Sequence, residues 1–401
     1  MNRTTTQTGE AASAHEAATL ELRSVTKRYP GADEDAIAEL SLEVPAGDIC
    51  VLVGPSGCGK TTAMRLVNRM ISITSGDILL AGRSVTELRP AELRKRIGYV
   101  IQQIGLFPHR TIAQNIATVP RLLDWKKERT AARVRELLDL VSLPAEMADR
   151  YPAQLSGGQR QRVGVARALA ADPPLMLMDE PFGAIDPITR ERLQNEFLRL
   201  QSELRKTIVF VTHDIDEAIK MGDRIAVLRK GGVLAQYATP AELLMAPADD
   251  FVEDFVGADR ALKRLALLRV RDVQLWRAPL VREGDSTAQA REQVRTSDLP
   301  YPLLVSEDGR PLGWLSEDDL VKGRVELPVD TAAEPVLDRD SVLRDALAEL
   351  LERDTQYGPV VDQRGHVVGV LSLELISHFL ASSDAIQADP ADRVTDTPAL
   401  S

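Results

Sequence analysis

Short runs of consecutive apolar residues recur in the first part of the chain, and polar residues follow each run at once. The runs occupy Ile49–Val53, Tyr99–Ile101, Leu175–Met178 and Thr207–Val211. Unbroken apolar runs of this length are typical of parallel strands that are buried on both faces. The carboxyl ends of such strands meet at one edge of an open sheet, where ligands bind. The pattern therefore predicts an α/β domain with a polar site along one sheet edge.

Two other patterns divide the rest of the chain. Apolar residues at three- and four-residue spacing between Val134 and Val141 predict an amphipathic helix, inside an insertion that covers residues 111–155. Beyond residue 257 the chain repeats a pattern of strand, tight turn, strand and helix. Four positions carry this repeat, since Gly309, Gly313, Ser316 and Leu320 recur 56 positions later as Gly365, Gly369, Ser372 and Ile376.

Composition narrows the class of protein. The net charge of −11 argues against a nucleic-acid polymer as partner, because domains that bind such polymers are usually basic. No apolar run approaches the roughly 18–20 residues that cross a bilayer, so a role at a membrane would need a partner that supplies the span. The first 19 residues lack the apolar core of a signal peptide and are expected to be a disordered tail. The two cysteines, Cys50 and Cys58, lie too close for a framework disulfide and favour a reducing compartment.

A phosphate-binding loop follows the first apolar run. The residues GPSGCGKTT fit the spacing G-x-x-x-x-G-K-[ST] and lead into a predicted helix. The glycines let backbone N–H groups converge on phosphate oxygens, and the start of the helix adds a positive dipole end. We expect Lys60 to reach the β and γ phosphates of ATP and the Thr61 hydroxyl to bind Mg²⁺. The expected ATP-binding residues of the loop are Gly54, Pro55, Ser56, Gly57, Cys58, Gly59, Lys60, Thr61 and Thr62.

The other apolar runs end in groups suited to phosphate hydrolysis. Asp179 is placed to hold Mg²⁺ through water, and Glu180 to orient or deprotonate the attacking water. Gln102 is expected to meet Mg²⁺ and the water, whereas His109 in the same stretch is structural or faces a partner. His213 follows the last run and is expected to contact the γ phosphate and hold the water.

These elements together resemble the ATPase subunits of ATP-binding-cassette (ABC) transporters over about residues 20–265. The resemblance implies a P-loop ABC ATPase domain over residues 20–257, with a helical subdomain at about 111–160. It also implies that Tyr29 stacks on adenine and that Asp186 lies at a dimer seam. The signature loop is expected to bind the ATP held by a second copy of the chain in an ATP-sandwich homodimer, and it comprises Leu155, Ser156, Gly157, Gly158 and Gln159.

Within that class, the closest resemblance is to ATPases of glycine betaine, carnitine, choline and proline importers. It rests on the stretches GPSGCGKTTAMRLVNRM, RIGYVIQQIGLFPH, MDEPFGAIDPITR and FVGADRALKRL. The resemblance implies ATP hydrolysis that powers solute import through a separate membrane permease, with an external solute-binding protein acting through that permease. The chain would then lie peripherally on the cytoplasmic face of the cell membrane.

The C-terminal repeat resembles a tandem pair of CBS domains, an α+β module named from cystathionine β-synthase. The expected parts are a linker helix at 258–270, CBS domains at 271–323 and 328–382, and an acidic tail at 383–401. The resemblance implies osmotic regulation through ionic strength or a nucleotide, with cyclic di-AMP as a candidate ligand. The first copy has Asp319 where family members hold ribose, whereas the second has Leu375, which argues against ordinary nucleotide binding there.

Three alternatives remain open on the sequence. The chain could serve an importer of another small cationic or zwitterionic solute. It could be a soluble ABC ATPase that acts on DNA or ribosomes, although such proteins usually carry a long coiled coil or two cassettes. It could also be a non-catalytic regulator that works through the CBS pair, although Lys60, Gln102, Glu180 and His213 argue against that.

Overall fold

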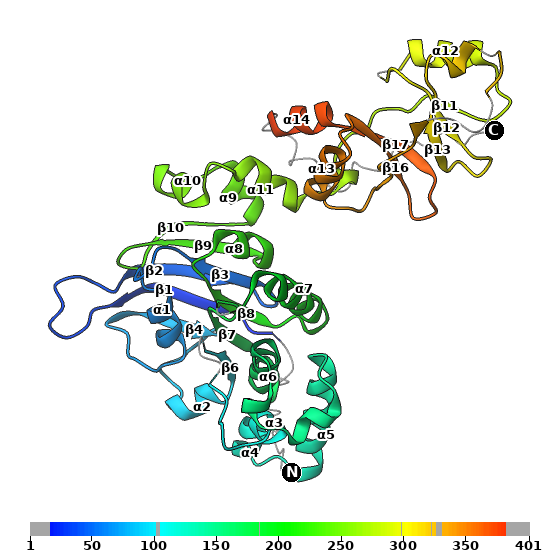
Figure 1. Cartoon of the computed structure of the whole chain (residues 1–401). Helices are drawn as coiled ribbons and strands as arrows, with labels where there is room; N and C mark the ends of the chain where they lie inside the picture. The colour runs from blue at the N-terminus through cyan, green and yellow to red at the C-terminus, as the bar shows by residue number, and fades with distance from the viewer. Residues whose placement is uncertain are drawn as a thin grey trace, which may run out of the picture. The chain divides into compact units, whose positions relative to one another are not determined.

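The computed structural model describes residues 17–101, 105–183, 185–297, 299–321, 323–325 and 331–381. The chain divides into two compact units, with the division between Gly257 and Ala258. Figure 1 labels the elements of both units, which we describe separately. Gln102, most of the N-terminal tail and the acidic tail lie outside the described residues.

A six-stranded sheet formed by the described residues lies at the centre of the N-terminal unit, in the order β10-β9-β3-β8-β7-β6. All neighbouring strands are parallel except β10, which is antiparallel to β9. The strands are β3 (Ile49–Val53), β6 (Ile97–Val100), β7 (Leu175–Asp179), β8 (Thr207–Val211), β9 (Arg224–Arg229) and β10 (Val233–Ala238). The apolar runs therefore form neighbouring parallel strands, as predicted, although the second strand begins two residues earlier than expected and ends one residue earlier.

A smaller antiparallel sheet packs on one face of the central sheet. Its order is β2-β1-β4-β5, with β1 at Leu20–Lys27, β2 at Ile37–Val44, β4 at Ser75–Leu80 and β5 at Arg83–Ser84. Alternate residues of the central strands enter different cores: Val51 lies in one hydrophobic cluster, and Leu52 lies with the small sheet in the other. Both faces of β3 are therefore buried, which explains its unbroken apolar sequence.

Helices cover the other core of the unit, and Figure 1 shows α3 to α6 gathered away from the small sheet. The predicted apolar face is buried, since Val134, Leu137 and Val141 all join the larger core cluster. The helical elements here are α3 (Ile112–Ile116), α4 (Thr118–Leu122), α5 (Lys127–Leu140), the 3-10 turns Ala145–Asp149 and Pro152–Gln154, and α6 (Gly157–Leu169). The remaining helices of the unit are α1 (Lys60–Val67), α2 (Pro90–Arg94), α7 (Pro187–Leu204), α8 (Ile215–Met221), α9 (Pro240–Met245) and α10 (Asp250–Val256).

The C-terminal unit contains the predicted repeat. Its helices are α11 (Arg260–Leu267), α12 (Thr287–Arg295), α13 (Leu343–Glu352) and α14 (Leu373–Ala381), with a 3-10 turn at Val270–Asp272. The first sheet holds β11 (Leu280–Val281), β12 (Leu303–Val305), β13 (Pro311–Trp314) and β14 (Thr331–Ala332), and the second holds β15 (Leu337–Asp338), β16 (Tyr357–Val361) and β17 (Val367–Ser372). The expected linker helix α11 belongs to this unit, because Leu265 is buried in its core with Leu343 and Leu350.

The two copies share their strand register. Leu304 pairs with Gly313 in the first copy, and Val360 pairs with Gly369, each 56 positions later, in the second. They differ after the second strand, where the second copy forms α14 and the first forms only a 3-10 turn at Asp319–Val321. The prediction of a helix in both copies is therefore wrong for the first, where Gly323 with a φ of +82° ends the turn early.

Segments of each copy also pair with the other copy. Strand β14 precedes the second copy's first strand, yet it pairs with β13 of the first copy. In the opposite direction, Trp276 lies ahead of the first strand of the first copy and forms an antiparallel bridge with Val370 of β17 in the second copy. A shared hydrophobic cluster that includes Leu303, Trp314 and Val370 lies between the copies. The C-terminal unit is therefore one module made of two interlocked copies.

Candidate functional site

The phosphate loop has a backbone that only glycine can form at two points. Gly59 caps α1 with a φ of +113°, and a Cβ there would lie 2.6 Å from the Ala36 carbonyl oxygen. At Gly54, with a φ of +153°, a Cβ would lie 2.2 Å from the Leu228 carbonyl oxygen. Any side chain at either position would force the loop away from β9 or β2, so the loop conformation depends on both glycines.

Lys60 folds back into the loop that precedes it. Its ammonium group donates hydrogen bonds to the carbonyl oxygens of Gly54 at 2.6 Å and Pro55 at 3.1 Å. The side chain is buried, so a phosphate group entering the loop would meet a preoriented positive charge. Cys58 is also buried, at 1% exposure, and a thiol reagent would reach it only when the loop opens.

Asp179 and Thr61 bring two oxygen atoms together at the edge of the sheet. Thr61 Oγ1 lies 3.2 Å from Asp179 Oδ1, across the gap between α1 and β7. Asp179 is 7% exposed, and this burial raises the pKa of its carboxyl group, with a further rise from the adjacent Glu180 charge. A buried carboxylate and a hydroxyl are oxygen ligands of the kind that Mg²⁺ prefers. Among the residues that the structure describes, no cluster of three or more His, Cys, Asp or Glu side chains could hold a metal ion.

Glu180 and His213 meet at the ends of neighbouring strands β7 and β8. His213 Nδ1 lies 3.3 Å from Glu180 Oε1, and the histidine side chain is 61% exposed. Glu180 adopts a φ of +43°, held by a hydrogen bond from its N–H to the Val211 carbonyl oxygen at 2.9 Å. The left-handed backbone is unusual for glutamate and turns the chain sharply at the end of β7. The structure thus brings together these two side chains, which the sequence separates by 33 positions.

The signature loop leads into α6, with Ser156 and Gly157 exposed and Leu155 buried in the larger core cluster. Ser156 Oγ accepts a hydrogen bond from the Gln159 N–H at 3.3 Å, and Gln159 Oε1 accepts one from the Ser156 N–H at 2.9 Å. This capping box leaves the hydroxyl proton of Ser156 available to a ligand. Gly157 is exposed and a Cβ there would meet nothing within 4 Å, so this unit gives no steric reason for glycine.

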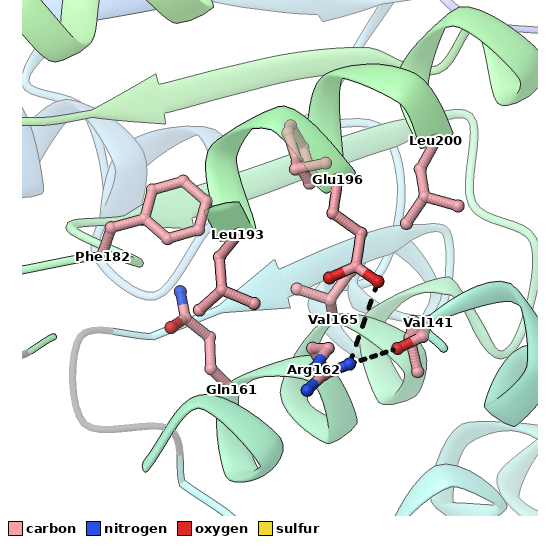
Figure 2. Close-up of a pocket in the computed structure, with 9 residues that line it drawn as sticks. Val141, Gln161, Arg162, Val165, Phe182, Leu193, Glu196 and Leu200 are labelled. Atoms are coloured by element: carbon pink, nitrogen blue, oxygen red, sulfur yellow. Dashed lines mark hydrogen bonds and ion pairs between the residues drawn. The ribbon is translucent and has the colours of Figure 1, made fainter. Parts of the chain in front are cut away.

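A buried glutamine outside the predicted motifs links helix α6 to the segment that follows the predicted catalytic acids. The Gln161 side-chain amide donates to the carbonyl oxygen of Pro181, the residue after Glu180. Figure 2 shows Gln161 extending from α6 toward Phe182, beside the ion pair between Arg162 and Glu196 of α7. Gln161 lies two residues after the signature loop on the inward face of α6, and that helical position was the available signal.

The remaining predicted residues lie apart from this cluster. Asp186 is the exposed N-cap of α7, and hydrogen bonds from Thr189 hold the pKa of its carboxyl group below the ordinary range. Tyr29 lies in the turn after β1, 38% exposed, with the Lys27 ammonium 5.2 Å from its ring centroid. In the C-terminal unit, Asp319 Oδ2 accepts hydrogen bonds from both the N–H and the hydroxyl of Ser316, at 2.8 and 2.6 Å.

A glycine-rich loop, a lysine, two acids and a histidine at the carboxyl edge of a parallel sheet define the class of phosphate-loop nucleotide hydrolases. The family description "ABC transporter" matches residues 37–183, and "CBS domain" matches residues 330–382. The chain is 45% identical to the glycine betaine/carnitine/choline transport ATP-binding protein OpuCA of Bacillus subtilis, over 88% of this chain and 94% of that one. It belongs to the family of transport ATP-binding proteins of ABC transporters, those of the glycine betaine, carnitine and choline type. ATP hydrolysis coupled to transport follows from that membership.

Other relatives agree in sequence and fold. The osmoprotectant import ATP-binding protein OsmV of Salmonella typhimurium is 45% identical over 90% of this chain and 96% of its own length. Among solved structures, the dimeric bacterial ABC transporter cassette MJ0796 matches with a TM-score of 0.50 and 34% identity, over 55% of this chain and 98% of that one. A second structure of that cassette is a dimer in a post-hydrolysis state bound to ADP and Pi. In the described part of our chain, no helix combines the length and apolar character that crossing a membrane requires.

Proposed function

We propose that the chain hydrolyses ATP to power the import of a quaternary-ammonium solute through a separate permease. The single observation that carries the proposal is the 45% identity to OpuCA over 88% of this chain and 94% of that one, because OpuCA is named for the transport of glycine betaine, carnitine and choline. On the import path, solutes of this kind would contact the external binding protein and the permease, and the ATP site of this chain would not touch them. An importer of another small cationic or zwitterionic solute is the alternative within the same class.

The site residues divide the chemistry between them. The loop Gly54–Thr62 binds the phosphates, with Lys60 reaching the β and γ groups. Thr61 and Asp179, together with Gln102, hold Mg²⁺, which neutralises phosphate charge when it is bound. Glu180 accepts a proton from the attacking water, and His213, 3.3 Å away, holds the glutamate and the γ phosphate in line. Tyr29 stacks on the adenine ring.

A second copy completes each ATP site. The exposed Ser156 hydroxyl and the N–H groups of Gly157 and Gly158 would bind the γ phosphate held by the partner's phosphate loop. The open space around Gly157 supports close approach of a partner there. At the seam, Ile188 follows Asp186 in the first turn of α7 and is 85% exposed, which is unusual for a large apolar side chain outside an interface.

The permease is expected to bind a groove between the central sheet and the helical subdomain. The groove has a volume of about 340 Å³, and its lining includes Arg94, Tyr99 and Phe107. Asn115 holds this loop in place: its Oδ1 accepts from the Phe107 N–H at 2.8 Å, and its amide donates to the Phe107 carbonyl oxygen at 3.2 Å. Exposed Phe107 on a fixed backbone favours an amphipathic helix of the permease as the partner. Binding there would place the chain peripherally on the cytoplasmic face of the membrane.

The C-terminal unit is proposed to regulate the ATPase. The family match covers the second copy only, and the shared register supports a CBS domain in the first copy as well. Because the Asp319 carboxylate already accepts two hydrogen bonds from Ser316, its expected role in holding ribose would compete with these contacts. Cyclic di-AMP at the pair is therefore the weaker of the two regulatory hypotheses, and a response to ionic strength is the stronger.

The test is reconstitution of the chain with its permease and binding protein in liposomes. ATP hydrolysis should rise when glycine betaine, carnitine or choline is added on the side of the binding protein. The solute should then accumulate on the side of the membrane that carries this chain. The variant Glu180→Gln should keep ATP binding and lose turnover by about 10²–10⁴-fold, the usual contribution of a general base. Glu203→Gln changes the same charge on the exposed face of α7 and should behave as wild type.

The possible negative results distinguish the substrate class, the role of Glu180 and the transport function. Stimulation by an unrelated small solute, with none by the quaternary amines, would replace the substrate class but keep the importer. Full turnover in Glu180→Gln would remove the assigned role of that glutamate. ATP hydrolysis that never responds to the permease would contradict the transport function itself.

A further inference from the structure

The C-terminal unit contains a cleft between its two copies that the proposed ATPase does not use. Its volume is about 700 Å³, large enough for a small organic molecule. The lining comes from both copies: Tyr301 and Trp314 belong to the first, and Asp354 and Tyr357 to the second. A ligand here would touch both copies at once and would therefore be sensitive to their relative arrangement.

Aromatic rings form one wall of the cleft. Trp314 is 6% exposed and meets Tyr357 in an edge-to-face contact, with ring centroids 5.4 Å apart. Tyr301 lies close enough for its phenol to add to the rise that burial causes in the pKa of Tyr357. The position of the Trp314 ring is fixed by the hydrophobic cluster beneath the cleft, where Trp314 packs with Leu303 and Val370. Such ring faces carry a negative quadrupole that attracts cations.

Acids form the rest of the charged lining. The carboxyl groups come from Glu317, Asp318, Glu334 and Asp354, and no described residue of the lining is basic. Arg353 pairs with Glu334, but both side chains are more than half exposed, so water screens the pair. An anionic ligand such as a di- or polyphosphate would meet like charge here. An organic cation would meet attraction from the carboxylates and from the ring faces together.

We propose that this cleft binds a quaternary-ammonium cation, which makes the C-terminal unit a sensor of the solute class that the transporter imports. The link to transport rests on the proposed function, whereas the expected binding of a cation depends only on the residues that line the cleft. A permanent cation without a carboxylate fits the acidic lining better than a zwitterion. We therefore expect choline and tetramethylammonium to bind more tightly than glycine betaine, and adenine nucleotides not to bind in the cleft.

The experiment is calorimetric titration of the full-length chain with choline chloride, tetramethylammonium chloride, glycine betaine and cyclic di-AMP, at an ionic strength matched with NaCl. The variant Glu317→Gln/Asp318→Asn should weaken choline binding by about tenfold or more, since it removes two carboxylates from the lining. The matched control is Glu307→Gln/Asp308→Asn, which loses the same charges in the exposed turn between β12 and β13 and should bind choline as wild type. Tyr301→Ala tests the aromatic wall at an exposed position and should weaken binding as well.

Three results would contradict the proposal that the cleft binds a quaternary-ammonium cation. Absence of choline binding to the wild type, equal loss in the cleft and control variants, or tighter binding of cyclic di-AMP than of choline would each overturn the proposal. Because titration needs no permease, import without choline binding contradicts only the sensor, whereas choline binding without import contradicts only the proposed transport function.

Discussion

The carboxyl group of Asp179 is an expected Mg²⁺ ligand, and it is also buried, so its negative charge lowers the stability of the fold. Burial raises its pKa, so the folded chain holds the proton more tightly than the unfolded chain does. In the pH range between the ordinary value of 3.8 and the raised pKa, the folded state binds more protons, and stability falls as the pH rises through that range. Above the raised pKa the full cost of the buried charge is present.

The variant Asp179→Asn should therefore be more stable than wild type at pH 7 while losing Mg²⁺-dependent ATP hydrolysis. A gain on the order of 1 kcal/mol would raise Tm by about 2–4 °C. The difference in Tm should shrink as the pH falls through the raised pKa. Thermal melts of both proteins from pH 8 down to the ordinary carboxyl value of 3.8, without Mg²⁺, measure the difference in Tm. A lower Tm for the variant at every pH would mean that the Asp179 carboxylate stabilises the fold.

Helix α6 shows how one element serves two purposes. Its capping box between Ser156 and Gln159 satisfies N–H groups at the start of the helix, and the same residues form the signature loop. Among the α-helices of the described residues, two others begin with a comparable box, α3 at Thr111 and α9 at Thr239. Helix α9 carries no predicted site residue, so it offers a comparison in which only the capping role is present.

Ser156→Arg should abolish ATP hydrolysis while leaving ATP binding to a single copy intact. Thr239→Arg is the matched control, because it also removes a capping box by the same substitution type. Each change should cost about 1 kcal/mol from the lost cap. ATP titration, ATPase rate and Tm should then show equal destabilisation but loss of hydrolysis in Ser156→Arg alone. Normal hydrolysis by Ser156→Arg would contradict the assignment of the signature loop to the partner's ATP.

Elements with local causes were predictable from the sequence, and contacts between distant elements were not. The runs Ile49–Val53 and Thr207–Val211 are strands because both of their faces are buried, and an unbroken apolar run reports that directly. The bond from Gln161 to Pro181 depends on how α6 packs against the end of β7, which no local pattern encodes. For the same reason the sequence predicted two similar repeats but not their shared cleft, whose lining comes from both copies.

The molecule as a whole consists of a catalytic unit and a second unit with its own cores. The division after Gly257 places α11 with the C-terminal unit, because Leu265 is buried there. A truncation that ends at residue 265 would keep most of α11 but remove the C-terminal residues against which Leu265 packs. A cut after Gly257 separates the units without this effect.

Truncation after Gly257 should retain permease-coupled ATP hydrolysis and lose its dependence on ionic strength. A second truncation after Ala381 removes only the acidic tail and separates its contribution from that of the CBS pair. Transport in vesicles at several KCl concentrations, for the full chain and both truncations, measures the response. The same ionic-strength profile in all three proteins would remove the C-terminal unit as an ionic sensor.

The crossed pairing in the C-terminal unit has a consequence for its folding. Because β14 completes the sheet of the first copy and Trp276 bridges to the second, neither copy contains all the backbone partners of its own sheet. Separated copies would each expose an unpaired strand edge, the feature that promotes association between chains. We therefore expect the two copies to fold and unfold in a single transition, so that a ligand that stabilises either one protects both.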